Sequence, residues 1–256
     1  MNIVVILRAV RDPASFTVNR KAQKIFIHRE QFICNPSDRN ALEAALALKD
    51  SQVTAVSYGG APADDLLRLA RALGASRSVL LGEASLQNAE AGAVTRALLT
   101  ALSGLGTVDL VLMGHEVLDA DLAQVGPRLA QALGWPFVEG AWQVEAFEEA
   151  GVRAIVSAGR ALAAGRAVEA DLPAVVSMRR DSNRPRYAAA GPVINAYSQA
   201  EAVEVIPADR LGLGGEAARV LFGGKAFPPE RSLGEVLDGA RPETLQTLAA
   251  VLRQEG

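Results

Sequence analysis

Short runs of apolar residues alternate, along the first half of the chain, with longer segments in which apolar residues recur every three or four positions. The short runs are rich in Val, Ile and Leu, and they occupy residues 2–7, 52–58, 77–81 and 109–113. Continuous apolar runs of this length are typical of strands that are buried on both faces of a parallel sheet. The sequence therefore predicts four buried parallel strands.

The segments between these strands have the periodicity of amphipathic helices. Each predicted helix has one apolar face, formed by Leu42, Ala45 and Leu46, then by Leu66, Leu69, Ala70 and Leu73, and then by Val94, Leu98, Ala101 and Leu102. The second helix also carries end signals, because Pro62 suits its first turn and Gly74 suits its C-cap. Strands and helices in alternation predict a doubly wound α/β fold.

Three other segments depart from this alternation. Residues 16–33 alternate between apolar and polar positions and carry basic residues in the middle, which predicts a solvent-facing hairpin after the first strand. Residues 138–178 contain further strand patterns separated by turns rich in Glu and Gly, and we expect them to add antiparallel strands to the sheet. From Asp181 onward the periodicity weakens, and only residues 232–254 again favour a helix.

Composition and charge narrow the class of protein. The chain has 256 residues, half of them hydrophobic, and a net charge of −3, which allows a large core but gives no general attraction to nucleic acid. Cys34 is the only cysteine, so an intrachain disulfide and a cysteine-based zinc or iron–sulfur site are excluded. The apolar run before Arg8 is too short for a signal peptide or a membrane span. We expect a cytoplasmic protein with no direct membrane insertion.

Three loops lie where α/β sheets bind anions and nucleotides, outside the carboxyl ends of strands and at the N-termini of helices. They fall within residues 34–46, 57–65 and 113–134. Ordinary helix capping by Asp38 and Asp121 explains part of the same pattern.

The third loop is the most informative. A predicted strand ends at Gly114, acidic residues follow, and a helix is expected to begin around residues 122–124. Gly126 then lies in the first turns of that helix, where the absence of a side chain lets another group approach the backbone.

No catalytic constellation is visible in the sequence. His28 and His115 are the only histidines and lie in different segments, which gives little basis for a metal centre or a Ser-His-Asp relay. Ser57 is not part of a G-x-S-x-G motif, and residues 223–225 lack the rest of a phosphate loop. These absences favour a cofactor-binding or carrier protein over a hydrolase.

Six motifs occur in the same order as in one known family. They are a basic strand end at Leu7-Arg8, an Asn-Pro-x-Asp run at 35–38, an Ala-x-Gly-Ala run at 72–75, an Asp-Leu-Val strand at 109–114, Leu-Gly-Trp-Pro at 133–136 and Pro-Arg-Tyr at 185–187. Over residues 1–210 the chain resembles the beta subunit of electron transfer flavoprotein.

This resemblance implies a mostly parallel sheet of the adenine-nucleotide-binding type and an electron-transfer subunit rather than an enzyme. Such a subunit forms a heterodimer with an alpha subunit, which passes electrons from flavin dehydrogenases to a membrane quinone reductase or another acceptor. One FAD is shared with the alpha subunit, and the beta subunit holds AMP or, in electron-bifurcating members, a second FAD. Residues 211–256 would then form an extended C-terminal arm that packs on the partner subunit.

The resemblance also implies which residues bind. The nucleotide site would comprise Ile6, Asn35, Pro36, Ser37, Asp38, Tyr58, Gly114, Asp119, Asp121, Ala123, Gln124, Val125, Gly126 and Pro127. Partner binding would involve Pro185, Arg186, Tyr187 and Ala190.

Several positions decide which branch of the family the chain resembles. Residues 123–127 read Ala-Gln-Val-Gly-Pro, as in the FixA-like, bifurcating branch. Val125 and Pro127 cannot donate side-chain hydrogen bonds to a monophosphate, which favours FAD over AMP. Leu122 replaces a Ser or Thr, and Glu116 would repel a phosphate at close range, so an empty site is a third possibility.

Other readings of the sequence stay open. Alanines at 188–190 replace an exposed leucine with which the family docks dehydrogenases, so we expect weaker docking. An adenine-nucleotide-binding regulatory module without flavin would have the same fold, and so would a nucleotide-using ligase or hydrolase. An ATP-using enzyme should carry a phosphate loop with Ser or Lys within residues 114–126, and this chain does not.

Overall fold

The computed structural model describes residues 1–118, 123–147, 151–157, 165–213, 227–229, 239 and 242–254. The chain divides into two units, residues 1–18 with 25–221 and residues 19–24 with 222–256. In the smaller unit, α6 (Pro242–Gln254) lies within the helix predicted over 232–254. The proposed division at residue 210, and the packing of the arm on a partner, stay predictions.

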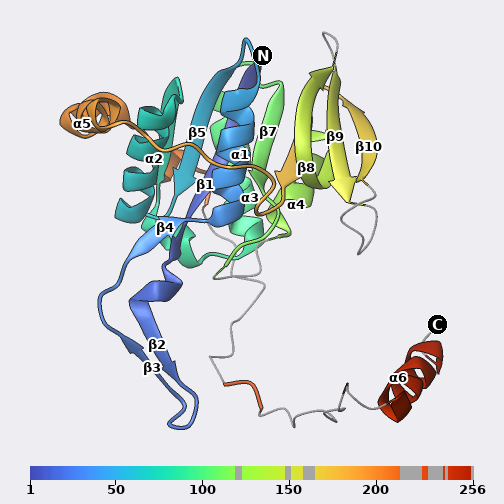
Figure 1. Cartoon of the computed structure of the whole chain (residues 1–256). Coiled ribbons are helices and arrows are strands. Elements are labelled where there is room, and N and C mark those ends of the chain that lie inside the picture. The colour runs from blue at the N-terminus through green and yellow to red at the C-terminus, as the bar shows by residue number, and fades with distance from the viewer. Residues whose placement is uncertain are drawn as a thin grey trace. The chain divides into compact units, whose positions relative to one another are not determined.

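A ten-stranded sheet forms the centre of the larger unit, with the strand order β10-β9-β8-β11-β7-β1-β5-β6-β12 and with β4 beside β1 (Figure 1). The four predicted parallel strands are confirmed as β1 (Asn2–Arg11), β5 (Gln52–Tyr58), β6 (Arg77–Gly82) and β7 (Leu110–Gly114). From β1 the chain builds outward through β5 and β6 and then places β7 on the other side of β1. The strand order therefore reverses between β1 and β7, where open α/β sheets bind ligands.

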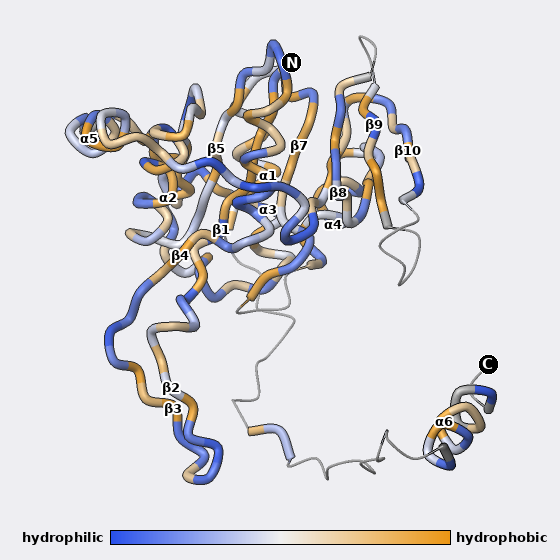
Figure 2. The backbone as a smooth tube through the Cα atoms, viewed as in Figure 1, coloured by the Kyte–Doolittle hydropathy of each residue, from blue (hydrophilic) through white to orange (hydrophobic). Residues whose placement is uncertain are grey.

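Helices cover both faces of the sheet, as the alternating pattern predicted (Figure 1). The helices α1 (Pro36–Ala47) and α2 (Ala61–Leu73) pack on one face, and α3 (Ala91–Gly104) and α4 (Val125–Leu133) pack on the other. Successive residues of β1 point to opposite faces, so that Val5 lies in the first core and Ile6 in the second. Figure 2 shows β1 and β7 as largely apolar strands at the centre of this arrangement.

The predicted punctuation of α2 is confirmed. Pro62 lies in its first turn, and Gly74 is its C-cap with a φ of 123°. The prediction for one residue of this helix was wrong, because Leu69 was expected on the buried face but is 36% exposed.

The inserted hairpin and the added antiparallel strands are also confirmed. The hairpin comprises β2 (Phe16–Asn19) and β3 (Lys24–Ile27), and β4 (Phe32–Cys34) returns antiparallel to β1. The strands β8 (Phe137–Phe147), β9 (Gly151–Ser157) and β10 (Gly165–Asp171) pair antiparallel. In contrast, β11 (Ala174–Met178) runs parallel between β7 and β8, and all five of its residues are buried, as is usual for an interior strand.

Two elements after Asp181 were not predicted. The helix α5 (Ala190–Ser198) packs against α2, and β12 (Glu204–Pro207) extends the sheet beside β6. Both depend on contacts with the domain rather than on their own periodicity, which is why the sequence pattern missed them. The described residues of the unit also form short 3₁₀ turns at Pro13–Ser15, Ala84–Asn88, Ala200–Ala202 and Ala208–Arg210. Among the described helices, none combines the length and the apolar character that crossing a membrane requires.

The helix α4 begins at Val125, slightly later than the expected start at residues 122–124. Its N-cap is Gln124, and Asp121, the expected cap, lies outside the described residues. Gly126 is buried, and a Cβ atom added to it would lie 2.9 Å from Cε2 of Phe137 and 3.1 Å from Sδ of Met113. The groups that approach this backbone are therefore side chains of the protein's own core.

We expect Gly126→Ala to lower the free energy of unfolding by about 1–2 kcal/mol, because the ring of Phe137 must move to admit the methyl group. The matched control is Gly104→Ala at the end of α3, where an added Cβ atom would have no neighbour within 4 Å. That change should be neutral or should stabilise the protein by up to about 1 kcal/mol. Urea unfolding of both variants measures the difference, and equal effects would contradict this packing argument.

Candidate functional site

The carboxylate of Asp38 joins two strands at the point where the strand order reverses. Its Oδ2 accepts a hydrogen bond from the backbone N–H of Arg8 in β1 at 2.7 Å, and its Oδ1 accepts one from the backbone N–H of Gly114 in β7 at 2.8 Å. The Nδ2 of Asn35 also donates to Oδ1, at 3.1 Å. The first turn of α1 is thereby fixed to both strands.

These contacts show that Asp38 does not act as a cap of its own helix. The N-cap of α1 is Asn35, whose side chain makes no capping hydrogen bond, and Asp38 bonds residues far away in the sequence. Gly114 is required by this arrangement, since a Cβ atom there would overlap Oδ1 of Asp38 and lie 2.8 Å from Cβ of Ser37. The glycine lets the helix approach the end of β7.

The environment of Asp38 disfavours its negative charge. The residue is only 4% exposed, and burial raises the pKa of its carboxyl from 3.8 to about 7. The hydrogen bonds from Asn35, Arg8 and Gly114 and the guanidinium of Arg8 act in the opposite direction, but they are the smaller effects.

Arg8 is a site residue that the sequence analysis did not select. Its side chain is 4% exposed; its Nη1 donates to the Tyr58 hydroxyl at 3.4 Å, and its Nη2 donates to the backbone oxygen of Gln87 at 3.0 Å. The guanidinium also lies 5.8 Å from the centroid of the Tyr58 ring. The sequence feature that could have identified Arg8 is its place as a charged residue near the end of an otherwise apolar strand.

Three buried polar atoms near this edge of the sheet have no hydrogen-bond partner within the described part of the chain: Oε1 of Gln87, Nε of Arg179 and Oγ of Ser182. Gln87 follows β6, and the other two residues follow β11, so all three come after the carboxyl ends of parallel strands. Buried polar atoms usually have a partner, and a polar ligand at this edge would provide one. Within the described residues these three atoms are thus the polar groups after the strand ends that are left without a partner.

The structure brings together only some of the predicted nucleotide-site residues. Asn35, Pro36, Ser37 and Asp38 form the start of α1 and meet Gly114, and Arg8 connects this group to Tyr58. Ile6 and Val125 instead fill the core between the sheet and the helices α3 and α4, with exposures of 3% and 2%.

The remaining predicted residues surround the start of α4. Ala123, Gln124 and Pro127 are exposed there, and Asp119 and Asp121 lie outside the described residues.

The residues after Gly114 are tied to neighbouring elements. The backbone oxygen of Glu116 accepts a hydrogen bond from Asn35 Nδ2 at 2.7 Å, and the Glu116 side chain is exposed. The Nδ1 of His115 lies 3.4 Å from the Ser177 hydroxyl and 4.0 Å from a carboxylate oxygen of Glu139. Both contacts use the same ring nitrogen, so they do not form a Ser-His-Glu relay. Within the described ranges, three or more His, Cys, Asp or Glu side chains do not converge on a possible metal site.

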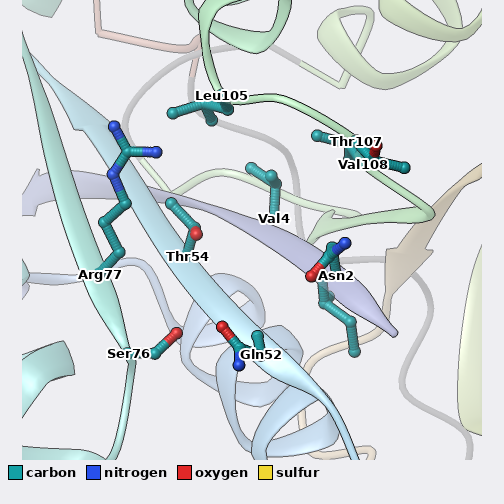
Figure 3. A pocket seen from close by; sticks show the side chains of 10 residues that line it. Asn2, Val4, Gln52, Thr54, Ser76, Arg77, Leu105, Thr107 and Val108 are labelled. Carbon is teal, nitrogen blue, oxygen red and sulfur yellow. The ribbon is translucent and has the colours of Figure 1, made fainter.

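A separate pocket of about 410 Å³ lies at the opposite edge of the sheet, at the amino ends of β1, β5 and β6 (Figure 3). Its lining includes Asn2, Thr54 and Arg77, and none of the predicted site residues contributes to it. The guanidinium of Arg77 is already paired with Glu204 of β12 at 2.6 Å. We therefore keep the candidate site at the carboxyl edge.

The predicted partner-binding residues lie on the segment that leads from β11 to α5. Pro185 is half-buried, Arg186 forms an ion pair with Glu43 of α1, Tyr187 is 89% exposed, and Ala190 begins α5.

The raised pKa of Asp38 predicts a specific pH dependence of stability. Between its ordinary pKa of 3.8 and its folded-state pKa of about 7, the folded protein holds a proton that the unfolded chain has lost, so stability falls as the pH rises through this window. Asp38→Asn removes this linkage, so the stability advantage of the wild type over the variant should shrink from about pH 4 to about pH 7.

Urea unfolding across this pH range measures the effect, and Asp171→Asn, at an exposed carboxylate, is the control. An advantage that grows with pH would mean that the hydrogen-bond donors outweigh burial.

Comparison with known proteins places this arrangement in a family. Residues 24–210 match the model of the electron transfer flavoprotein domain. The chain is 31% identical to the electron transfer flavoprotein subunit beta of Thermoanaerobacterium thermosaccharolyticum, over 97% of this chain and 96% of the relative. It is also 31% identical to subunit CarD of the caffeyl-CoA reductase-Etf complex of Acetobacterium woodii, over 93% and 92%.

A further relative is protein FixA of Azorhizobium caulinodans, which is 34% identical over 79% of this chain and 74% of the relative. The chain therefore belongs to the electron transfer flavoprotein family, among its beta subunits.

Proposed function

We propose that this chain binds an adenine nucleotide and works with an alpha subunit as a heterodimeric electron carrier. The heterodimer would take electrons from flavin-dependent dehydrogenases and deliver them to a quinone reductase or another acceptor, and the chain itself would not be an enzyme. The observation that carries the proposal is the group of buried polar residues around Asp38 at the reversal of strand order. A cytoplasmic location stays a prediction.

In this proposal the nucleotide lies along the carboxyl edge, beside the first turns of α1 and α4. Asn35 and Asp38 fix the start of α1 against β1 and β7, so the backbone around the crevice is ordered before a ligand arrives. Arg8 places a buried positive charge near the end of β1, which would favour an anionic ligand. When FAD is bound, it supplies the electron-accepting chemistry, and the residues of this chain supply binding and orientation.

We propose FAD rather than AMP as the nucleotide. Pro127 lies in the first turn of α4, where its missing N–H has no helical partner, and neither Pro127 nor Val125 offers a side-chain hydrogen bond to a monophosphate. Val125 is also buried in the core, so only its backbone can contribute to binding.

The relatives suggest a class of electron donor or acceptor. One is named as part of a caffeyl-CoA reductase complex, and another as an electron transfer subunit of acryloyl-CoA reductase. We propose that this chain serves a flavin enzyme that acts on an acyl-CoA substrate.

The nucleotide content of the purified heterodimer tests the proposal. After denaturation we expect two FAD molecules per heterodimer, measured by absorbance and chromatography. One FAD with one AMP would contradict the choice of FAD in the beta site, and one FAD alone would indicate an empty beta site. A complex without flavin would contradict the carrier function and favour the regulatory module.

A variant pair locates the beta-site nucleotide. Asn35→Ala removes the amide that binds both Asp38 and the backbone of Glu116. The amount of the second nucleotide retained per heterodimer should therefore fall about tenfold or more, while the FAD shared with the alpha subunit is retained. Gln143→Ala, which removes an exposed amide on β8, is the control. If both variants retain the second nucleotide equally, the nucleotide does not bind at Asn35.

A further inference from the structure

Arg179 is the first residue after β11, at the carboxyl edge of the sheet. Its backbone N–H donates a hydrogen bond to the backbone oxygen of Ala141 in β8 at 2.9 Å. On the other side of β11, the backbone N–H of His115, which follows β7, donates to the backbone oxygen of Met178 at 2.8 Å. Arg179 is therefore held in line with β11, between β8 and the end of β7.

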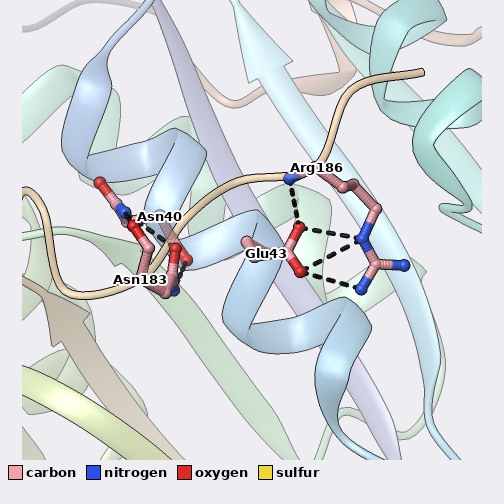
Figure 4. A network of polar contacts seen from close by, with 4 residues as sticks. All are labelled: Asn40, Glu43, Asn183 and Arg186. Atoms are coloured by element: carbon pink, nitrogen blue, oxygen red, sulfur yellow. Dashed lines mark hydrogen bonds and ion pairs between the residues drawn. The ribbon is translucent and has the colours of Figure 1, made fainter.

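The chain that follows Arg179 is attached to helix α1. Figure 4 shows two of these contacts: Nδ2 of Asn40 donates to Oδ1 of Asn183 at 2.8 Å, and Nε of Arg186 donates to the carboxylate of Glu43 at 2.9 Å. The positive charge of Arg186 is thereby neutralised within the chain. Since β11 precedes Arg179 and these contacts follow it, the backbone at Arg179 is held from both directions.

The side chain of Arg179 lies on the face of the sheet that α4 covers. Along β11, Val175 packs in the core beneath α3 and α4, and Ser177 and Arg179 follow it at intervals of two residues. The helix α4 packs against β11 and β8, and its Gly126 lies close to Met113, which is opposite Ser177 in β7. The guanidinium of Arg179 and the first turn of α4 thus belong to the same corner of the sheet.

Gly140 of β8 makes room for this guanidinium. The pairing of β8 with β11 is irregular between Val176 and Met178, and Gly140 there has a φ of 67°. A Cβ atom added to Gly140 would lie 3.1 Å from Nε of Arg179 and 3.5 Å from its Cζ. The backbone N–H of Gly140 donates to Oγ of Ser177 at 2.9 Å. One side of the guanidinium is therefore covered by glycine backbone, and irregularities of this kind re-aim side chains next to functional sites.

The charge of Arg179 is not neutralised by any residue that the structure describes. Its Nε is buried without a hydrogen-bond partner, and the ion pairs formed among the described residues do not include it. In contrast, Arg180 lies 3.6 Å from the carboxylate of Asp181, and Glu139 lies 4.0 Å from His115. A partly buried cation without a counter-charge is unfavourable, so this corner is suited to an anion from outside the chain.

We propose that Arg179 binds a phosphate group between the end of β11 and the first turn of α4. The inference deepens the proposed function and rests on it, because an adenine nucleotide carries such a group. A guanidinium matches the geometry of phosphate oxygens, and the backbone N–H groups at the start of a helix attract the same charge. Arg179 would supply the positive charge that Val125 and Pro127, in the first turn of α4, cannot provide. A free phosphate ion has the same chemistry and is the other source to be distinguished.

The role of Arg179 is tested in the heterodimer prepared without a nucleotide in the beta site, by titration with ADP and with adenosine. Arg179→Gln should weaken ADP binding about tenfold or more and leave adenosine binding unchanged, because only ADP carries phosphate. The matched control is Arg180→Gln, which removes the same charge at the next residue, where the side chain is 55% exposed. This control should leave the binding of both compounds unchanged.

Thermal unfolding of the same proteins separates a binding role from a structural one. Without ligand, Arg179→Gln should be at least as stable as the wild type, since it removes an unneutralised charge, but it should lose the stabilisation that ADP gives the wild type. An equal loss of ADP and adenosine binding would show that Arg179 only maintains the fold of the site. Unchanged ADP binding would show that Arg179 does not contact phosphate, and either result would overturn the inference.

Pyrophosphate, which has neither base nor sugar, distinguishes this inference from the proposed function. It should stabilise the wild type against thermal unfolding and should not stabilise Arg179→Gln. If pyrophosphate binds at Arg179 but ADP and FAD do not bind to the beta subunit, the free ion is the ligand and the proposed nucleotide function is contradicted. If ADP binds equally to the wild type and to Arg179→Gln, the nucleotide function stands and the role of Arg179 is contradicted.

Discussion

The structure depends on one buried carboxylate at the place where two neighbouring strands separate. β1 and β7 pair only from Ile3 to Val5, and beyond that point their backbone N–H groups need other acceptors. Asp38 supplies an acceptor to each strand, and this brings the start of α1 between them. The start of helix α1 thus occupies the place where the strand order reverses, at the cost of burying a carboxyl group.

The same helix has two tasks along its length. Its first turn organises the candidate nucleotide site, and its next two turns hold the segment from Asp181 to Arg186 through Asn40 and Glu43. In α1, the residues that face the sheet are small or apolar, such as Ala41 and Ala45, so the helix lies close to the strands. The candidate nucleotide site and the segment from Asp181 to Arg186 are therefore both attached to the same helix.

The sequence predicts the parts of this fold whose signal is local. The apolar strands, the helix ended by Gly74 and the hairpin after β1 all follow from patterns within a few residues. The role of Asp38 could not be read in this way, because its partners lie 30 and 76 positions away. The side chains of Ile6 and Val125 are buried in the core, so their predicted place in the nucleotide site stays a prediction about their backbone atoms.

The attachment of β12 to β6 affects how the chain acquires its final form. The residues that pair in this edge are widely separated, with Glu204 opposite Val79 and Pro207 opposite Gly82. During synthesis, β6 therefore remains an open edge until the last quarter of the chain has emerged, and open edges are sites of intermolecular strand pairing. Once β12 has paired with β6, the long edge of β6 is covered by a strand of only four residues from the same chain.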